Sequence, residues 1–426
     1  MHNLSIIIAQ IIVIIFLSRA IGWLFKRIHQ PQVVGEMVAG ILLGPSLLGW
    51  IAPGISLALF PAESLGFLNT LSQIGLLLFM FLVGLELDPA LLRRRGRVTL
   101  LISTVSITLP FFLGMILALY LYPRLSDGSV QFAYFALFLG TAMSITAFPV
   151  LARILSERKM LGTPIGSVSI ACAAINDVAG WIILAAVVLL VRRSEADIPL
   201  WWILAGVTIY IGLMLFGVRR LLIHLEALYL RRDDITQGIL AIILLVVLAS
   251  SWVTENLGIH ALFGAFVAGA VMPRHHSFAQ TLTLKLHDAT VVLLLPLFFA
   301  YTGLRTSLGL VDGARMWFYT GLIVTVAIAG KFGGTAIAGR LSGMPLREAG
   351  ALGILMNTRG LMELVLLNIG LEIGVISPVM FSMLVFMALF TTFMTAPVLE
   401  WIHFARIFPG KHDSSEPQDI TPDVLV

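Results

Sequence analysis

Runs of about 20 apolar residues recur along the whole 426-residue chain, separated by short polar loops. Hydrophobic residues make up 59% of the sequence and charged residues 12%, whereas soluble domains are about 45–50% apolar and about 25% charged. A backbone inside lipid must satisfy its own hydrogen bonds, and a helix of this length does so within one segment. The pattern therefore predicts an all-α polytopic membrane protein.

Thirteen apolar runs are candidates for membrane-spanning helices. The ninth is the shortest. Their approximate ranges are 4–25, 33–50, 64–87, 98–122, 130–156, 163–191, 199–218, 234–255, 258–272, 287–305, 316–339, 347–371 and 376–403. Together they predict a transmembrane domain over residues 1–410, followed by a short disordered cytoplasmic tail over 411–426.

The basic residues divide unequally between the two sets of loops. Loops that follow odd-numbered helices, together with the tail, hold 18 Lys and Arg residues, and the opposite set holds five. Short cytoplasmic loops are enriched in Lys and Arg. We therefore expect the N-terminus outside and the C-terminus in the cytoplasm. This distribution also explains the net charge of +4 without a nucleic-acid partner.

Four charged residues lie near the middle of predicted spans: Asp177 in the sixth, Lys331 in the eleventh, and Arg359 and Glu363 in the twelfth. A charge at the bilayer centre costs about 2.5–3.5 kcal/mol on insertion scales, so such residues need a partner or a function. Arg359 and Glu363 are spaced i, i+4 and can neutralise each other along one helix face.

Two spans contain residues that interrupt a helix at mid-depth. The fifth carries Thr141, Ser144, Thr146 and Pro149, and proline removes a backbone donor. The twelfth carries the sequence NTRG, residues 357–360. Helices five and twelve are seven apart, so they cross the membrane in opposite senses.

That offset predicts two inverted repeats of six helices. They cover about 4–191 and 234–403, and a linker helix of about 199–218 joins them. Interrupted helices at matching positions of two halves are typical of the binding site of a secondary transporter.

The sequence resembles a known family, the monovalent cation:proton antiporters. It is most similar to the membrane part of the plant-type cation/proton exchangers and their bacterial relatives. The resemblance is carried in order by PQVVGEMVAGILLGPSLLG, GLLLFMFLVGLELD, AMSITAFPVLARIL, AAINDVAGWIILA, IHALFGAFVAGAVMP, LLLPLFFAYTGLRT and NTRGLMELVLLNIG.

The resemblance implies a homodimer in which a core domain moves against a dimerisation domain. It also implies that the two broken helices cross near Asn176 and Asp177. Asp177 is then the residue that binds the cation or the proton. Asn176, Ser144 and Thr146 are the expected additional ligands, and Lys331, Arg359 and Glu363 supply supporting charge.

The chemistry of a buried carboxyl group agrees with this role. Burial disfavours the charged form, so a proton and a monovalent cation compete for Asp177. Two roles stay open for Lys331: a structural one, which favours electroneutral one-for-one exchange, and pairing with Asp177 with release of a proton of its own.

Three functions are compatible with these sequence features. The first is a secondary antiporter that exchanges sodium or potassium for protons by alternating access. The others are a sodium-coupled solute symporter on a similar scaffold and a membrane sensor that does not transport. Protons, alkali cations, lipids and a second copy are the expected partners. The sequence contains no nucleophile elbow, metal-ligand cluster or dinucleotide fingerprint, so we expect neither enzymatic activity nor a cofactor.

Overall fold

The computed structural model describes residues 2–28, 30–86, 97–126, 128, 130–158, 160, 163–193, 200–232, 234–257, 260–273 and 276–402. Within these ranges the chain is helical and has no strand. The predicted tail, 411–426, lies outside them. The fold is that of an all-α membrane protein, as the apolar runs predict.

The first half of the chain contains the helices α1 (His2–Arg27), α2 (Gln32–Leu43), α3 (Leu48–Ile51), α4 (Pro53–Leu59), α5 (Ala62–Glu86), α7 (Arg97–Leu125), α8 (Phe132–Ser144), α9 (Phe148–Glu157) and α10 (Pro164–Arg193). A long helix follows, formed by α11 (Leu200–Gly212), the π-helical turn η1 (Leu213–Val218) and α12 (Arg219–Arg232).

The second half contains α13 (Gln237–Asn256), α14 (Ala261–Ala270), α15 (His276–Asp288), η2 (Ala289–Leu294), α16 (Leu295–Arg305), η3 (Leu308–Leu310), α17 (Gly313–Ile328), η4 (Ala329–Gly333), α18 (Gly334–Leu341), α19 (Leu346–Met356), α20 (Leu361–Glu372) and α21 (Pro378–Trp401). Here η2 and η4 are π-helical turns that join their neighbours into continuous helices.

The count of thirteen spans is not confirmed by helix length. In the described part of the chain, ten helices are long and apolar enough to cross a membrane, and the bent pair α19–α20 makes eleven. The predicted fifth and ninth spans correspond to the shorter apolar helices α8 and α14, because the fifth is broken and the ninth has 10 residues. The linker helix continues past 218 to Arg232, because residues 219–232 (RRLLIHLEALYLRR) contain no Gly or Pro and extend the helix beyond the apolar run.

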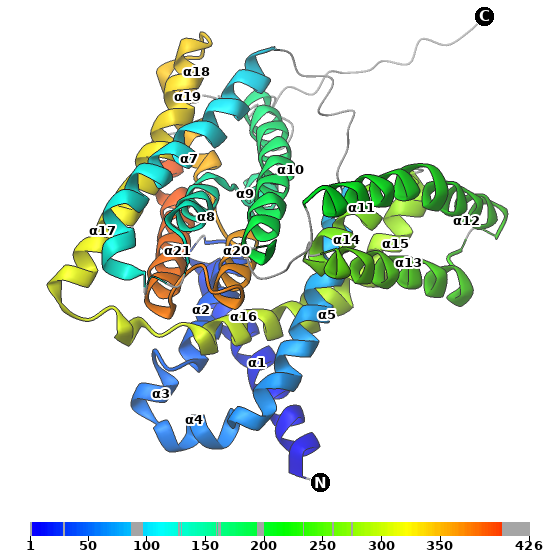
Figure 1. Cartoon of the computed structure of the whole chain (residues 1–426), viewed down its shortest axis with the longest axis horizontal. Coiled ribbons are helices and arrows are strands. Elements are labelled where there is room, and N and C mark those ends of the chain that lie inside the picture. Colours follow the sequence, from blue (N-terminus) through cyan, green and yellow to red (C-terminus); the bar gives the residue numbers. More distant parts are fainter. Residues whose placement is uncertain are drawn as a thin grey trace, which may run out of the picture.

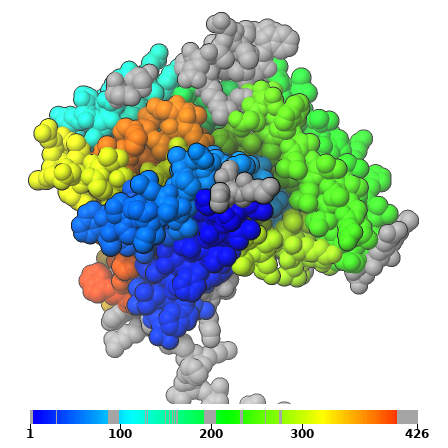
Figure 2. Space-filling model, turned by 90° about the horizontal axis from the view of Figure 1, so that it is seen from below, coloured from blue at the N-terminus to red at the C-terminus, as the bar shows by residue number. Residues whose placement is uncertain are grey.

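The helices form two bundles, which are visible in Figure 1. The core bundle, residues 97–193 and 313–401, packs α7 against α8, α10 and α18, and α17 against α21. The scaffold bundle, residues 2–86 and 237–305, packs α2 against α1 and α16, and α5 against α14 and α16. Seen from the side that carries α3 and α4, the blue N-terminal helices cover the middle of the molecule (Figure 2).

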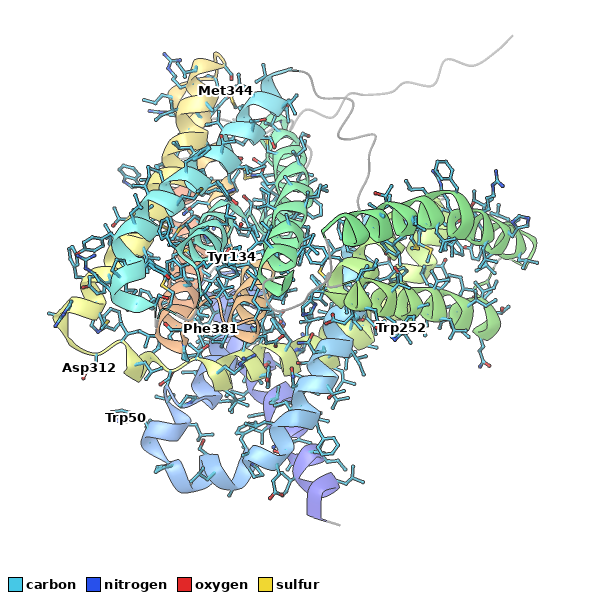
Figure 3. The ribbon with its side chains drawn as sticks, in the orientation of Figure 1. Trp50, Tyr134, Trp252, Asp312, Met344 and Phe381 are labelled. Carbon is cyan, nitrogen blue, oxygen red and sulfur yellow. The ribbon has the colours of Figure 1, made fainter. Side chains whose placement is uncertain are left out.

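Burial separates the interior of the core bundle from its periphery. Ten consecutive residues of α20, 361–370, are buried, and Phe381 of α21 is fully enclosed. Large apolar side chains face outward elsewhere, including Trp50 at 79% and Trp252 at 69% exposure, which project from the surface in Figure 3. An outer surface of this kind is suited to lipid rather than water.

Paired glycines in the scaffold bundle reveal the relation between the two halves. The segment VGEMVAG, ending at Gly40, matches FGAFVAG, ending at Gly269, and VGL around Gly84 matches TGL around Gly303. Gly40 packs against Gly303 where α2 crosses α16, and Gly269 packs against Gly84 where α14 crosses α5. Each half thus contributes one glycine to each crossing.

Candidate functional site

The two helix interruptions predicted from the sequence meet inside the core bundle. The first covers residues 145–147, between α8 and α9, and the second covers 357–360, between α19 and α20. The hydroxyl of Thr146 donates to the carbonyl of Met356 at 3.0 Å, and the Ala147 N–H donates to the carbonyl of Thr358 at 3.0 Å. These two bonds fix the crossing of the broken helices.

Positive side chains surround the C-terminal end of α8. Arg359 donates from Nη1 to the carbonyl of Ala142 and from Nη2 to that of Met143, at 2.5 and 2.7 Å. Lys331 Nζ donates to the carbonyl of Ser144, the last residue of α8. The last carbonyls of a helix lack partners within the helix and carry partial negative charge. The two cations therefore satisfy and neutralise this buried helix end.

Lys331 lies in the π-helical turn η4 and is fully buried. Its ammonium also donates to the carbonyl of Ser106 at 2.9 Å. When the amide of Asn176 is oriented to satisfy its neighbours, its oxygen accepts from Lys331 at 3.2 Å. An ammonium has three N–H donors, and these three acceptors use all of them. Lys331 forms no ion pair with Asp177 at 4.0 Å or less, so the geometry favours the structural role over the pairing role.

Asp177 lies near the centre of α10 and is 2% exposed. Neither of its carboxylate oxygens has a hydrogen-bond partner among the described residues. The backbone N–H of Phe148, the first residue of α9, and the ammonium of Lys331 both act on it electrostatically. A buried ionised carboxylate without hydrogen bonds is very unfavourable. The side chain therefore requires a proton or a cation.

Asn176 is tied to α7 by two serines that the sequence reasoning missed. Its amide lies 2.7 Å from Ser106 Oγ and 3.0 Å from Ser103 Oγ, and Thr146 Oγ1 is 3.4 Å away. Both serines are fully buried. The sequence does contain a signal for these two serines: their hydroxyls are spaced i, i+3 in the apolar run LISTVSITL, which places them on one helix face.

The predicted ligands Ser144 and Thr146 both lie at the first break, but they are engaged differently. The Ser144 hydroxyl donates to the carbonyl of Thr141 in its own helix at 2.9 Å, and it is the backbone carbonyl of Ser144 that meets Lys331. Thr146 reaches across to the second break, as described above. The oxygens of both hydroxyls keep lone pairs that can face a cation.

Arg359 and Glu363 form the predicted i, i+4 ion pair. Their Nη1 and Oε2 atoms are 3.0 Å apart, and both side chains are completely buried. The other carboxylate oxygen of Glu363 has no partner within the described residues. The pair thus lies beside the crossing, with its positive member turned toward the end of α8.

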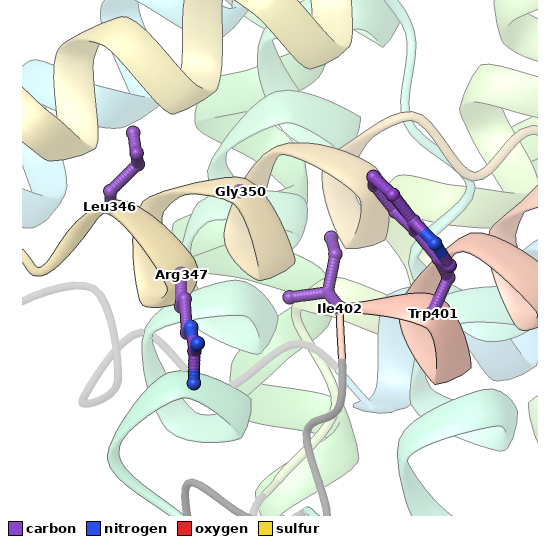
Figure 4. A pocket seen from close by; sticks show the side chains of 5 residues that line it. All are labelled: Leu346, Arg347, Gly350, Trp401 and Ile402. Atoms are coloured by element: carbon purple, nitrogen blue, oxygen red, sulfur yellow. The ribbon is translucent and has the colours of Figure 1, made fainter.

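A surface pocket elsewhere in the core bundle contains neither a helix break nor a buried carboxylate. It lies between the start of α19 and the end of α21 and is lined by Leu346, Arg347, Gly350, Trp401 and Ile402 (Figure 4). Leu346 is ten residues before Met356, the last residue of α19, and about 15 Å from it along the helix. The pocket is therefore distinct from the crossing.

Two broken helices that cross beside an unpartnered carboxylate are typical of a secondary transporter. The family described as sodium/hydrogen exchanger, transmembrane, matches residues 12–403, and the chain belongs to this family.

Individual relatives agree with this assignment. The chain is 44% identical to the Na(+)/H(+) antiporter NhaS4 of Synechocystis, over 96% of this chain and 98% of that protein. It is 42% identical to Cation/H(+) antiporter 17 of Arabidopsis thaliana, and 33% identical to K(+)/H(+) antiporter 1 of Saccharomyces cerevisiae. These two matches cover 96% and 94% of this chain but only 49% and 46% of the relatives. The chain thus spans about half the length of the plant and yeast proteins.

The fold has a counterpart among solved structures. The sodium proton antiporter MjNhaP1 from Methanocaldococcus jannaschii superposes with a TM-score of 0.63, at 15% identity, over 95% of this chain and 98% of that one. At this identity the likeness concerns the fold.

Proposed function

We propose that this protein exchanges a sodium or potassium ion for a proton across the membrane, and that both bind at Asp177 in turn. The observation that carries the proposal is the buried carboxylate that has no hydrogen-bond partner at the crossing of two broken helices. Only the protonated or cation-loaded form is neutral enough to move past an apolar barrier. Competition for one carboxylate, combined with this restriction, makes the exchange obligatory.

The environment of Asp177 supports a cation rather than an organic solute as the second ligand. Oxygen atoms are the donors that hard cations prefer. Those at the crossing come from the carboxylate, from Thr146 and from the hydroxyl of Ser144, while Asn176 supports them from the next position of α10. These assignments agree with the names of the relatives, which include Na(+)/H(+) and K(+)/H(+) antiporters.

Charge balance favours one-for-one exchange. Lys331 uses its three donors on two carbonyls and one amide, and Arg359 is paired with Glu363. Asp177 is then the one group at the crossing whose charge changes between the two loaded forms. Replacing a proton with a monovalent cation leaves the net charge of the site unchanged.

The arrangement of the bundles supports alternating access by movement of the core bundle against the scaffold bundle. The broken helices, Asp177 and Lys331 all belong to the core bundle, so the site can travel as one unit. We further propose the repeat boundaries of about 4–191 and 234–403, a homodimer built through the scaffold bundle, and an inner-membrane location with the N-terminus outside. The uneven distribution of loop Lys and Arg supports this orientation.

The test uses everted membrane vesicles that hold a trapped pH-sensitive dye and an imposed proton gradient. Addition of sodium or potassium should collapse the gradient with the native protein and leave it intact with Asp177→Asn, since the variant is neutral without a cation. Asn256→Asp serves as a control for expression, because Asn256 is an exposed residue at the end of α13. Cation-driven uptake of an organic solute would indicate a symporter, and no response to either would indicate a sensor.

A further inference from the structure

The two breaks carry equivalent threonines with unequal surroundings. Thr146 is the second residue after Ser144, where α8 ends, and Thr358 is the second residue after Met356, where α19 ends. The Thr146 hydroxyl donates to the carbonyl of Met356, the last residue of the opposite half-helix. By the inverted repeat, the Thr358 hydroxyl would donate to the carbonyl of Ser144.

That carbonyl is already occupied by the ammonium of Lys331. The Thr358 hydroxyl has no hydrogen-bond partner among the residues that the structure describes, although Thr358 is 0% exposed. Buried hydroxyls are normally bonded, so an unpartnered one calls for a ligand. The Ser144 carbonyl thus accepts from the lysine, and the Thr358 hydroxyl remains available to a ligand.

The position of Thr358 connects it to Asp177. Its carbonyl accepts from the N–H of Ala147, and the hydroxyl of the preceding residue, Thr146, lies 3.4 Å from the amide of Asn176, the neighbour of Asp177 in α10. The second break, which carries Thr358, therefore meets the first break beside the Asn176–Asp177 position of α10. The side-chain oxygen of the neighbouring Asn357 is also buried and unpartnered.

We propose that Thr358 supplies a hydroxyl ligand to the alkali cation bound at Asp177 and so helps to set the preference between sodium and potassium. This inference rests on the proposed function. A hydroxyl oxygen offers lone pairs to a metal ion without adding charge, so the one-for-one balance is kept. A proton on the carboxyl group does not need this ligand. Loss of the hydroxyl should therefore weaken cation binding and leave proton binding unchanged.

The experiment measures the cation concentration for half-maximal dye response in everted vesicles, for sodium and for potassium separately. Thr358→Val keeps the side-chain shape and removes the oxygen. We expect it to raise the KM for the preferred cation about tenfold and to change the sodium-to-potassium ratio, because one ligand is lost. Thr358→Ser, which keeps the hydroxyl, should stay near the native KM.

Thr320→Val is the matched control. Thr320 is also buried, but its hydroxyl donates to the carbonyl of Met316 within α17, and its loss should leave KM unchanged. Native KM values and an unchanged cation ratio in folded Thr358→Val would overturn the inference. Absence of exchange in the native protein would instead overturn the proposed function.

A second measurement covers the case in which Thr358→Val does not transport. Sodium and potassium are added to purified protein, and the melting temperature is recorded. A ligand that binds the folded state raises this temperature. We expect the native protein and Thr358→Ser to show the rise at lower cation concentrations than Thr358→Val. Equal concentration dependence in Thr358→Val and the native protein would also contradict the role of Thr358.

Discussion

Lys331 contacts Asn176 and not its neighbour in sequence, Asp177. The ammonium lies 3.2 Å from the amide oxygen of Asn176, and it makes no ion pair with the carboxylate one residue further along α10. Successive residues of an α-helix point about 100° apart, so the two side chains face different neighbours. Asn176 faces Lys331 and α7, whereas Asp177 faces the start of α9. The helix thus directs Asn176 into a hydrogen-bond network and leaves the Asp177 carboxylate without a partner among the described residues.

Replacement of Asn176 by Asp should change the charge balance of transport. Asn176→Asp puts a carboxylate beside the Lys331 ammonium, and the two charges should form an ion pair. A cation entering the site would then displace a proton from this pair as well as from Asp177. We expect sustained currents on a solid-supported membrane from this variant and none from the native protein. Native currents that follow cation flux would contradict one-for-one exchange.

Removal of Lys331 should affect stability more than ion affinity. Lys331→Ala leaves the carbonyls of Ser106 and Ser144 without their donor, and an unsatisfied buried acceptor costs about 1–3 kcal/mol. The melting temperature of the purified variant should therefore fall, while the protein that remains folded exchanges cations with a native KM. Lys285→Ala is the control, because Lys285 is a partly exposed residue in the scaffold bundle. A large rise in KM without loss of stability would show that Lys331 acts on the ion.

Removal of Arg359 should lower the free energy of unfolding more than removal of most other charged residues. Arg359→Ala leaves Glu363 buried without its partner and uncaps the carbonyls of Ala142 and Met143, and breaking a buried pair costs about 3–5 kcal/mol. The loss should be smaller when Glu363→Gln is present, because no unpaired carboxylate then remains. A double-mutant cycle from denaturation curves measures this coupling. Arg340→Ala, at an exposed position of α18, should be nearly neutral, and equal losses at 359 and 340 would refute the assignment.

The glycine crossings of the scaffold bundle should tolerate no side chain. A methyl group on Gly303 would overlap with the backbone of Gly40, and one on Gly84 would overlap with the carbonyl of Phe266. We expect Gly303→Ala and Gly84→Ala each to destabilise the protein by about 1–3 kcal/mol, because the helices must separate. Gly321→Ala is the control, since no other group lies within 4 Å of its added carbon. If Gly303→Ala melts no lower than Gly321→Ala, the close packing of α2 on α16 is disproved.

The sequence by itself determined the membrane class, the breaks in the fifth and twelfth spans, the position of the Asp177 carboxyl group near the middle of a span and the Arg359–Glu363 pair. Each of these depends on local information: the length of an apolar run, a residue that interrupts a helix, a charge at mid-depth, or an i, i+4 spacing. These patterns follow from the geometry of a single helix, and the structure agrees with them because no distant contact is needed to produce them.

Only the tertiary structure decided which groups meet. Lys331 is 187 residues from Ser144 and 225 from Ser106, yet it donates to both carbonyls. It contacts the end of α8 and Asn176, whereas the Thr358 hydroxyl and the Asp177 carboxylate have no hydrogen-bond partner among the described residues. The periodicity of one helix shows which side chains share a face but not which helix will lie against that face. That choice depends on packing between helices far apart in sequence, and close glycine crossings such as Gly40 on Gly303 contribute to it.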